Sequence, residues 1–495
     1  MSHLLKNENK IFFKSFKVFV IFVIIILFYL GINNYNGNKL IYVSFSIVSN
    51  FLIFFAFRKN ALFFETFFSL LLWLGFWFKF TCTIALTDGL FREGVGLFNY
   101  TDQSFNKTLI VSQVGIIAFI LSGYFREFFF FKYPKKIIFK FPKNNFFKKN
   151  RIKIWTIFVL FIILIGFSNF HYKIYQKGLL PIYEINFLLS GIFKWLLLFG
   201  MSTISAIIIF YEASTFKKFF FSSSLLMFFE TFFTSLSMLS RGMIFNACAL
   251  LYGIYKFSKK IKHINKINYY IKSIIVIFVL FYVSVSSVNY IRANFFYVGK
   301  SAEFTLEKFK KEKEIPSSEK VERKYATLSQ HNSEILYLLI NRWVGIDGIM
   351  AVISKNEILS PIFLIDSFKE RADPKKPTFY ELTFNLENFD SSYEIYSNVK
   401  GNTLPGIIAF LFYGGSYYLL FILMFFISLI ASLIEYCSFK FSYNNMIFSA
   451  LIGQVIAFRL IHFGYLPHQS YLLFGTIIIT IFLVFLINSF FKKIY

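Results

Sequence analysis

Long apolar runs of about 20 residues recur along most of the chain, and short polar stretches separate them. A helix needs about 20 apolar residues to cross the hydrocarbon core of a bilayer, so each run is a candidate membrane span. The pattern predicts an all-α polytopic membrane protein. The twelve predicted spans are residues 18–32, 39–57, 61–86, 108–125, 153–169, 186–210, 217–240, 242–257, 272–290, 416–437, 443–463 and 469–490.

The spans divide the chain into three parts. Residues 1–290 hold the first nine spans, residues 291–403 form one large polar loop, and residues 404–495 hold a re-entrant segment and the last three spans. The first span follows several lysines and lacks a small-residue cleavage site, so we expect a retained anchor rather than a removed signal peptide.

The distribution of charge predicts the orientation of the loops. Lys and Arg gather in loops 125–153 and 256–272, whereas loop 291–403 balances 16 Lys and Arg with 16 Asp and Glu. Because basic loops remain in the cytoplasm, these two loops and both chain termini are predicted to be cytoplasmic. The large loop is predicted to lie outside.

Composition supports a membrane protein and argues against a nucleic-acid partner. The chain is 57% hydrophobic and 22% aromatic, which exceeds what a soluble domain carries. Basic cytoplasmic loops explain the net charge of +26, so we expect no nucleic-acid partner. The cysteines Cys82, Cys248 and Cys437 lie far apart, which argues against a disulfide framework or a metal cluster.

The large loop contains an apolar stretch, SEILYLLINRWVGIDGIMAVI (333–353), whose helical spacing predicts an amphipathic helix on the membrane surface. Arg342 falls on its apolar stripe, and His331, about three turns earlier, would share that face. Gly345, about one turn beyond Arg342, removes a side chain where a ligand or another backbone could approach. A scaffold helix with Trp343 at headgroup depth is the alternative.

Three segments and the topology together resemble the O-antigen polymerase family, the oligosaccharide repeat-unit polymerases of bacterial envelopes. The segments are RWVGIDGIMAV (342–352), SRG (240–242) and LPGIIAFLFYGGS (404–416). The resemblance covers most of the chain and implies metal-independent glycosyl transfer, without a cofactor, at the periplasmic face of the bacterial inner membrane. A glycan on undecaprenyl diphosphate would be moved onto an incoming lipid-linked repeat unit. A chain-length regulator and a flippase are further candidate partners, beside membrane lipids.

A diphosphate leaving group calls for guanidinium groups, which offer forked hydrogen-bond donors. Four arginines are predicted to face outside: Arg241 between spans seven and eight, Arg292 after span nine, Arg342 in the loop, and Arg459 near the end of span eleven. We expect them to converge, with Arg241 and Arg342 catalytic and the other two binding substrate. An anchor that reaches the membrane interface is the alternative for each.

Further polar groups complete the predicted site. Thr403 is expected to cap a helix whose first N–H groups, near Gly406, bind phosphate, although an ordinary capped entry into the membrane explains the pattern equally well. Gly414 and Gly415 are expected to separate a short re-entrant piece from the next span. Asp347 is expected to orient the Arg342 guanidinium or a sugar hydroxyl.

The acceptor hydroxyl needs a general base, and His468, Asp347 and His331 are the candidates. His468 lies in HQSYL, which is similar to the His-Asn-x-Tyr-Leu stretch of O-antigen ligases, with Gln469 in place of Asn and in a short turn instead of the large loop. A histidine that only caps an interface is the alternative.

Two charges inside predicted spans, Lys194 and Glu230, are expected to form an ion pair. A flippase or another transporter uses similar buried charges, and an O-antigen ligase acts on a closely related substrate. Both classes remain alternatives to a polymerase.

Overall fold

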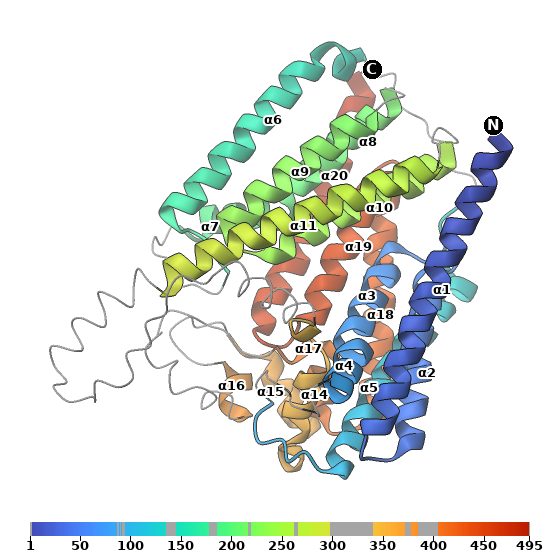
Figure 1. The fold of residues 1–495 in the computed structure, drawn as a ribbon. Coiled ribbons are helices and arrows are strands. Elements are labelled where there is room, and N and C mark those ends of the chain that lie inside the picture. Colours follow the sequence, from blue (N-terminus) through green and yellow to red (C-terminus); the bar gives the residue numbers. More distant parts are fainter. Residues whose placement is uncertain are drawn as a thin grey trace, which may run out of the picture.

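The computed structural model is helical throughout the residues it describes, and no strand occurs among them (Figure 1). The described residues are 2–86, 89, 91, 95–134, 145–177, 186–215, 219–261, 266–297, 340–371, 378–384 and 404–494. The elements are α1 (Ser2–Asn34), α2 (Lys39–Ala56), α3 (Phe63–Trp73), η1 (Leu74–Phe78), α4 (Lys79–Leu86), α5 (Asp102–Phe125), η2 (Arg126–Phe130), α6 (Asn145–Tyr172), α7 (Phe187–Trp195), η3 (Leu196–Gly200), α8 (Met201–Thr215), α9 (Phe219–Met238), η4 (Arg241–Met243), α10 (Ile244–Ile261), α11 (Lys266–Tyr297), α14 (Ile346–Ile353), η5 (Asn356–Ile358), α15 (Pro361–Phe368), α16 (Phe379–Thr383), α17 (Gly406–Leu411), η8 (Phe412–Gly414), α18 (Tyr417–Phe441), α19 (Met446–Ile461) and α20 (Pro467–Ile494).

Helix occupies each of the twelve predicted ranges. Within the described residues, seven helical segments are long and apolar enough to cross a membrane, which confirms a helical membrane protein. They are Lys39–Ala56, Phe63–Leu86, Asp102–Phe130, Phe147–Tyr172, Phe187–Ala213, Tyr417–Phe441 and Pro467–Ile487. Shorter apolar helices are Val18–Asn34, Ile275–Ile291 and Met446–Ile461. That all twelve ranges cross the bilayer, including α9 and α10, stays a prediction.

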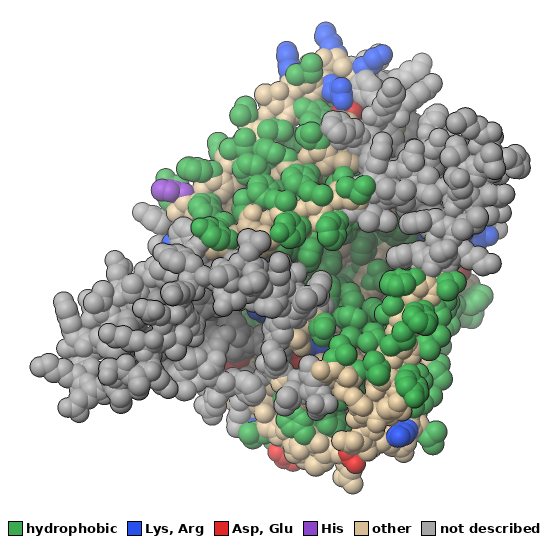
Figure 2. Space-filling view, in the orientation of Figure 1, with side chains coloured by type: hydrophobic (Ala, Val, Ile, Leu, Met, Phe, Trp, Pro, Cys, Tyr) green, Lys and Arg blue, Asp and Glu red, His purple; other side chains and the backbone are tan. Residues whose placement is uncertain are grey.

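The surface agrees with a membrane setting. Hydrophobic side chains cover broad parts of the described face in Figure 2. Phe167 on α6, Phe278 on α11 and Phe482 on α20 are all more than half exposed. In a bilayer, lipid tails would cover such side chains.

Helix α19 is the centre of the bundle. It packs against α3 and α18 on one side and against α8 and α10 on the other (Figure 1). All of its side chains except Phe458 and Arg459 are buried. Helices α6 and α11 pack on α9, farther from this centre.

Four short helices, α14 to α17, gather at one end of the bundle, called here the loop end (Figure 1). Every residue of α14 is buried, because α14 packs against α5 and α17. The chain leaves the helical path at residues 342–345. The prediction of one continuous helix on the membrane surface over residues 333–353 is therefore wrong.

The predicted break after α17 is confirmed. Helix α17 ends in the short η8 turn, and Gly415 has a φ of +69°, a left-handed conformation that glycine adopts without a steric penalty. Ser416 then caps α18, since its side chain accepts a hydrogen bond from the Leu419 N–H. A short buried helix thus precedes the long apolar one.

At the opposite end of the bundle, charged side chains form a closed network. The Glu65 carboxylate accepts hydrogen bonds from Arg126, at 2.8 Å to each oxygen, and from Arg58 at 2.7 Å. Arg58 also pairs with Glu127 at 3.1 Å. Nearby, the Glu435 carboxylate accepts hydrogen bonds from the first N–H groups of α3.

Candidate functional site

The turn between α6 and α7 is held against the end of α9. The Asn169 side chain donates hydrogen bonds to the carbonyls of Tyr175 and Ser237, at 3.0 and 2.8 Å. The Lys177 N–H donates to the Met238 carbonyl at 3.0 Å. These bonds place Lys177 close to the start of η4, where Arg241 lies.

The C-terminal end of α19 also lies close to Lys177 and Arg241. The Lys177 ammonium lies 5.2 Å from the centre of the Phe458 ring, a cation–π contact. Lys177 and Arg459 both interact electrostatically with His462. Gly242, which follows Arg241, faces the Phe458 ring so closely that an added Cβ would lie 3.1 Å from it. We call Lys177, Lys194, Arg241 and Arg459 the basic cluster.

Tyr175 joins Lys194 to this cluster. The Lys194 ammonium lies 5.7 Å from the centre of the Tyr175 ring. Burial raises the pKa of the Tyr175 phenol, and the nearby positive charge of Arg459 partly lowers it. The phenol therefore stays neutral beside two cations and can donate a hydrogen bond to an acceptor.

Within the part of the chain that the structure describes, the Arg459 guanidinium has no hydrogen-bond acceptor. Its Nε–H is buried without a hydrogen-bond partner, and no described residue forms an ion pair with it. A buried donor without an acceptor costs about 1–3 kcal/mol, and more if it is charged. An anionic ligand would remove this cost, so the cluster suits a phosphate or carboxylate.

The turn that carries Arg342 lies beside the cluster. The rings of Trp343 and Phe245 are 6.2 Å apart, and those of Phe245 and Phe458 are 5.5 Å apart. Arg342 itself is exposed and forms no hydrogen bond or ion pair with any residue in the described ranges. The Arg342 turn thus lies near Arg241 and Arg459, and the convergence of all four predicted arginines stays a prediction.

Asp347 has a different partner from the one predicted. It is buried and forms an ion pair with Lys79, the first residue of α4. Because the helix is interrupted before Gly345, Arg342 and Asp347 do not share one continuous helix, and that part of the prediction is wrong. Gly345 packs against the backbone of Gly75, so protein fills the space that was expected to admit a ligand.

The remaining predicted site residues show no contact with the basic cluster or are not fully described. Gly406 begins α17 with a φ of +76° and is buried beside Val344 and Ile461. His468 is exposed in the first turn of α20, and the structure shows no contact between it and the cluster. His331 and Thr403 lie outside the described residues, and for Arg292, in α11, the structure describes the backbone alone. The predicted roles of all these residues stay predictions.

The expected ion pair between Lys194 and Glu230 is wrong. The Glu230 carboxylate instead accepts hydrogen bonds from the hydroxyls of Ser202, Thr231 and Thr234, at 3.0 to 3.3 Å. The π-helical turn η3 follows α7 directly and changes the angular position of the residues after it. Hydroxyl donors therefore satisfy this buried carboxylate.

Sequence reasoning missed Lys79, Tyr175 and Lys177. Lys79 carried a usable signal, because a charge inside an apolar run is costly and commonly functional. Lys177 lies in a short polar turn, where its type gives no indication of a role. Among the described residues, no group of three or more His, Cys, Asp or Glu side chains could hold a metal ion.

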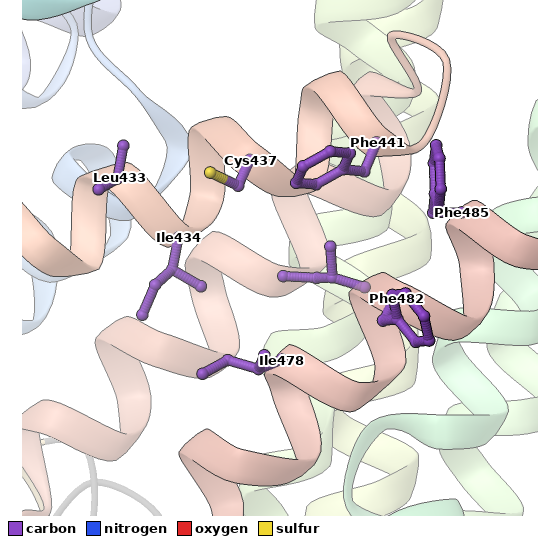
Figure 3. Close-up of a pocket in the computed structure, with 8 residues that line it drawn as sticks. Leu433, Ile434, Cys437, Phe441, Ile478, Phe482 and Phe485 are labelled. Carbon is purple, nitrogen blue, oxygen red and sulfur yellow. The ribbon is translucent and has the colours of Figure 1, made fainter.

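An apolar groove of 440 Å³ lies between α18 and α20 (Figure 3). Its lining is Leu433, Ile434, Cys437, Phe441, Ile478, Ile481, Phe482 and Phe485. These side chains suit hydrocarbon and provide no charged or hydroxyl group. The groove therefore offers no side chain that could bind an anion.

Comparisons with family models, with curated proteins and with solved structures found no significant match to this chain.

Proposed function

We propose that this chain polymerises oligosaccharide repeat units carried on undecaprenyl diphosphate at the periplasmic face of a bacterial inner membrane. The observation that carries the proposal is the basic cluster at the loop end, where Arg459 has no acceptor among the described residues. Guanidinium and ammonium groups gathered beside short buried helices fit a diphosphate at the membrane surface. The resemblance of the RWVG, SRG and LPG segments adds the substrate class.

In this reaction a hydroxyl oxygen of the incoming repeat unit attacks the anomeric carbon of the growing glycan. The new C–O bond forms while the bond to the diphosphate breaks, and the bonding electron pair leaves with the diphosphate. Arg459 and Arg241 offset the charge that develops on the leaving group, and Arg342 approaches from the rim of the site. The hydroxyl proton passes to a base, for which His468 is the predicted residue.

Deletion of the gene, followed by gel analysis of the envelope polysaccharide, tests the proposal. A single repeat unit on the lipid core is the expected product, because transfer to the core would continue without polymerisation. Complete loss of the glycan would favour a ligase or a flippase and overturn the proposal. An unchanged polysaccharide would also contradict it.

Arginine variants returned to the deletion strain locate the site. Arg342→Ala and Arg342→Lys should both fail to restore polymer, because a point charge cannot reproduce forked recognition. Arg371→Ala is the matched control, since Arg371 is an exposed arginine of the same loop. Full-length polymer from Arg342→Ala at normal protein level would place the chemistry elsewhere.

A further inference from the structure

Lys79 lies inside the bundle, and its side chain contacts the large loop. Its side chain is 2% exposed, and it directly follows the π-helical turn η1. Gly75 in that turn lies against the backbone of Val344 and Gly345, and any Cβ at position 75 would overlap the Val344 carbonyl. The absence of a side chain at Gly75 thus lets the loop approach Lys79.

The Lys79 ammonium donates to three acceptors from one short segment. They are the Asn341 carbonyl at 2.6 Å, the Trp343 carbonyl at 3.2 Å and the Asp347 carboxylate. An ammonium has three N–H donors, so these acceptors match its full capacity. The segment is thereby fixed at three points.

Two of these acceptors flank Arg342. The carbonyls immediately before and after it both turn inward to Lys79, and the Arg342 side chain itself is exposed. We propose that Lys79 is a positioning residue that holds the backbone on both sides of Arg342 and so presents its guanidinium to the substrate. The catalytic part of this inference rests on the proposed function.

The first test follows the position of the turn and needs no catalytic activity. Full-length protein in membranes would carry a spin label on a cysteine at position 342, with Cys82, Cys248 and Cys437 replaced by alanine. Lys79→Met should make the label more mobile, whereas Asp347→Asn, which keeps both carbonyl contacts, should change it much less. Equal mobility with Lys79 and with Met at position 79 would overturn the proposal.

The second test measures polymer formation from lipid-linked substrate in membranes. Misplacement of a reacting group by about 1 Å costs about a hundredfold in rate, so Lys79→Met should lose polymer by about that factor. If Lys79 acts through Arg342, adding Lys79→Met to Arg342→Ala should cause no further loss. Multiplied losses in the double variant would show that Lys79 acts independently of Arg342 and would overturn the proposal.

Lys79→Met removes the ammonium that pairs with the buried Asp347 carboxylate, and the variant can fail to accumulate. The double variant of Lys79→Met and Asp347→Leu removes both charges and preserves folding better, and it still lacks the two carbonyl contacts. It should show the same mobile label and the same loss of polymer. If deletion of the gene leaves the polysaccharide unchanged, the proposed function fails, while the label still decides whether Lys79 holds the turn.

Discussion

The two ends of the helical bundle differ in the partners that they give to arginine side chains. At the end opposite the loop, Arg126 is fully buried and binds both oxygens of Glu65, which Arg58 also contacts. At the loop end, the buried Nε–H of Arg459 finds no acceptor in the described ranges, and the neighbouring cations Lys177 and Lys194 lie over aromatic rings. The first arrangement pairs its arginines within the protein, whereas the second leaves Arg459 without an acceptor among the described residues.

The contrast shows that the residue type alone does not indicate a site. Both arginines occur at the ends of apolar helices, where sequence patterns make them equivalent. Only the partners distinguish them, because a fully paired guanidinium has no capacity left for a ligand. Predicted effects therefore differ between the two ends: loss of stability at the paired end, and loss of function at the loop end.

Removal of the Glu65 carboxylate should have the largest effect. Glu65→Leu leaves the Arg126 and Arg58 guanidinium groups without their shared acceptor, which should lower the free energy of unfolding by about 3–5 kcal/mol. The amount of folded protein after heating in detergent measures this loss. Asp366→Leu, which removes an exposed pair with Lys369, should cost less than about 1 kcal/mol. Equal losses of stability in Glu65→Leu and Asp366→Leu would contradict the structural role of the paired end.

Replacement of Arg459 should affect function and spare the fold. Arg459→Ala should lower polymer formation by about a hundredfold to a thousandfold, as expected when a group that stabilises developing charge is lost. Arg459→Lys should recover little of the activity, because the forked donors are missing. Gel profiles and immunoblots of the same membranes decide the result. A fall in protein level equal to the fall in polymer would show that Arg459, like Arg126, mainly stabilises the fold.

Close packing between η1 and the loop should be the next most sensitive feature. Gly75→Ala forces the new Cβ against the Val344 carbonyl, and such overpacking should cost about 1–3 kcal/mol. At Gly191 in α7, an added Cβ meets no atom within 4 Å, so Gly191→Ala should stabilise the helix by up to about 1 kcal/mol. Thermal unfolding in detergent should therefore shift in opposite directions for the two variants.

The smallest expected effect concerns Lys194 and Glu230. Since the two side chains have separate partners, the destabilisation caused by Lys194→Leu and by Glu230→Leu should add within about 0.5 kcal/mol in the double variant. A double-variant cycle on thermal unfolding measures the coupling. A double variant that is more stable than either single variant would indicate an ion pair between Lys194 and Glu230 and contradict the structure.

The sequence predicted the helical class of the protein well, because the length and apolarity of a helix are properties of a single segment. It also predicted the break at Gly415, where a left-handed turn needs glycine. It failed for α14, because a surface helix was expected although residues 346–353 are apolar on nearly every side, a pattern typical of a buried helix.

Contacts between distant segments were beyond a single sequence. Lys79 and Asp347 are 268 residues apart, and neither local sequence indicates that the two side chains form a pair. Lys194 and Glu230 were paired because each was costly alone, yet nearby hydroxyls already satisfy Glu230. Convergence of Arg241 and Arg459 was predicted from charge, whereas Lys177 and Tyr175 enter the site only through the folded turn between α6 and α7.

The central place of α19 has a consequence for how the protein is made. This helix follows α3, α8, α10 and α18 in the chain, and in the finished fold it fills the space among them. The faces of these helices that pack on α19 can therefore be covered only after residues 446–461 have been synthesised. A chain that stalls before that point would leave the inner faces of α3 and α10 uncovered.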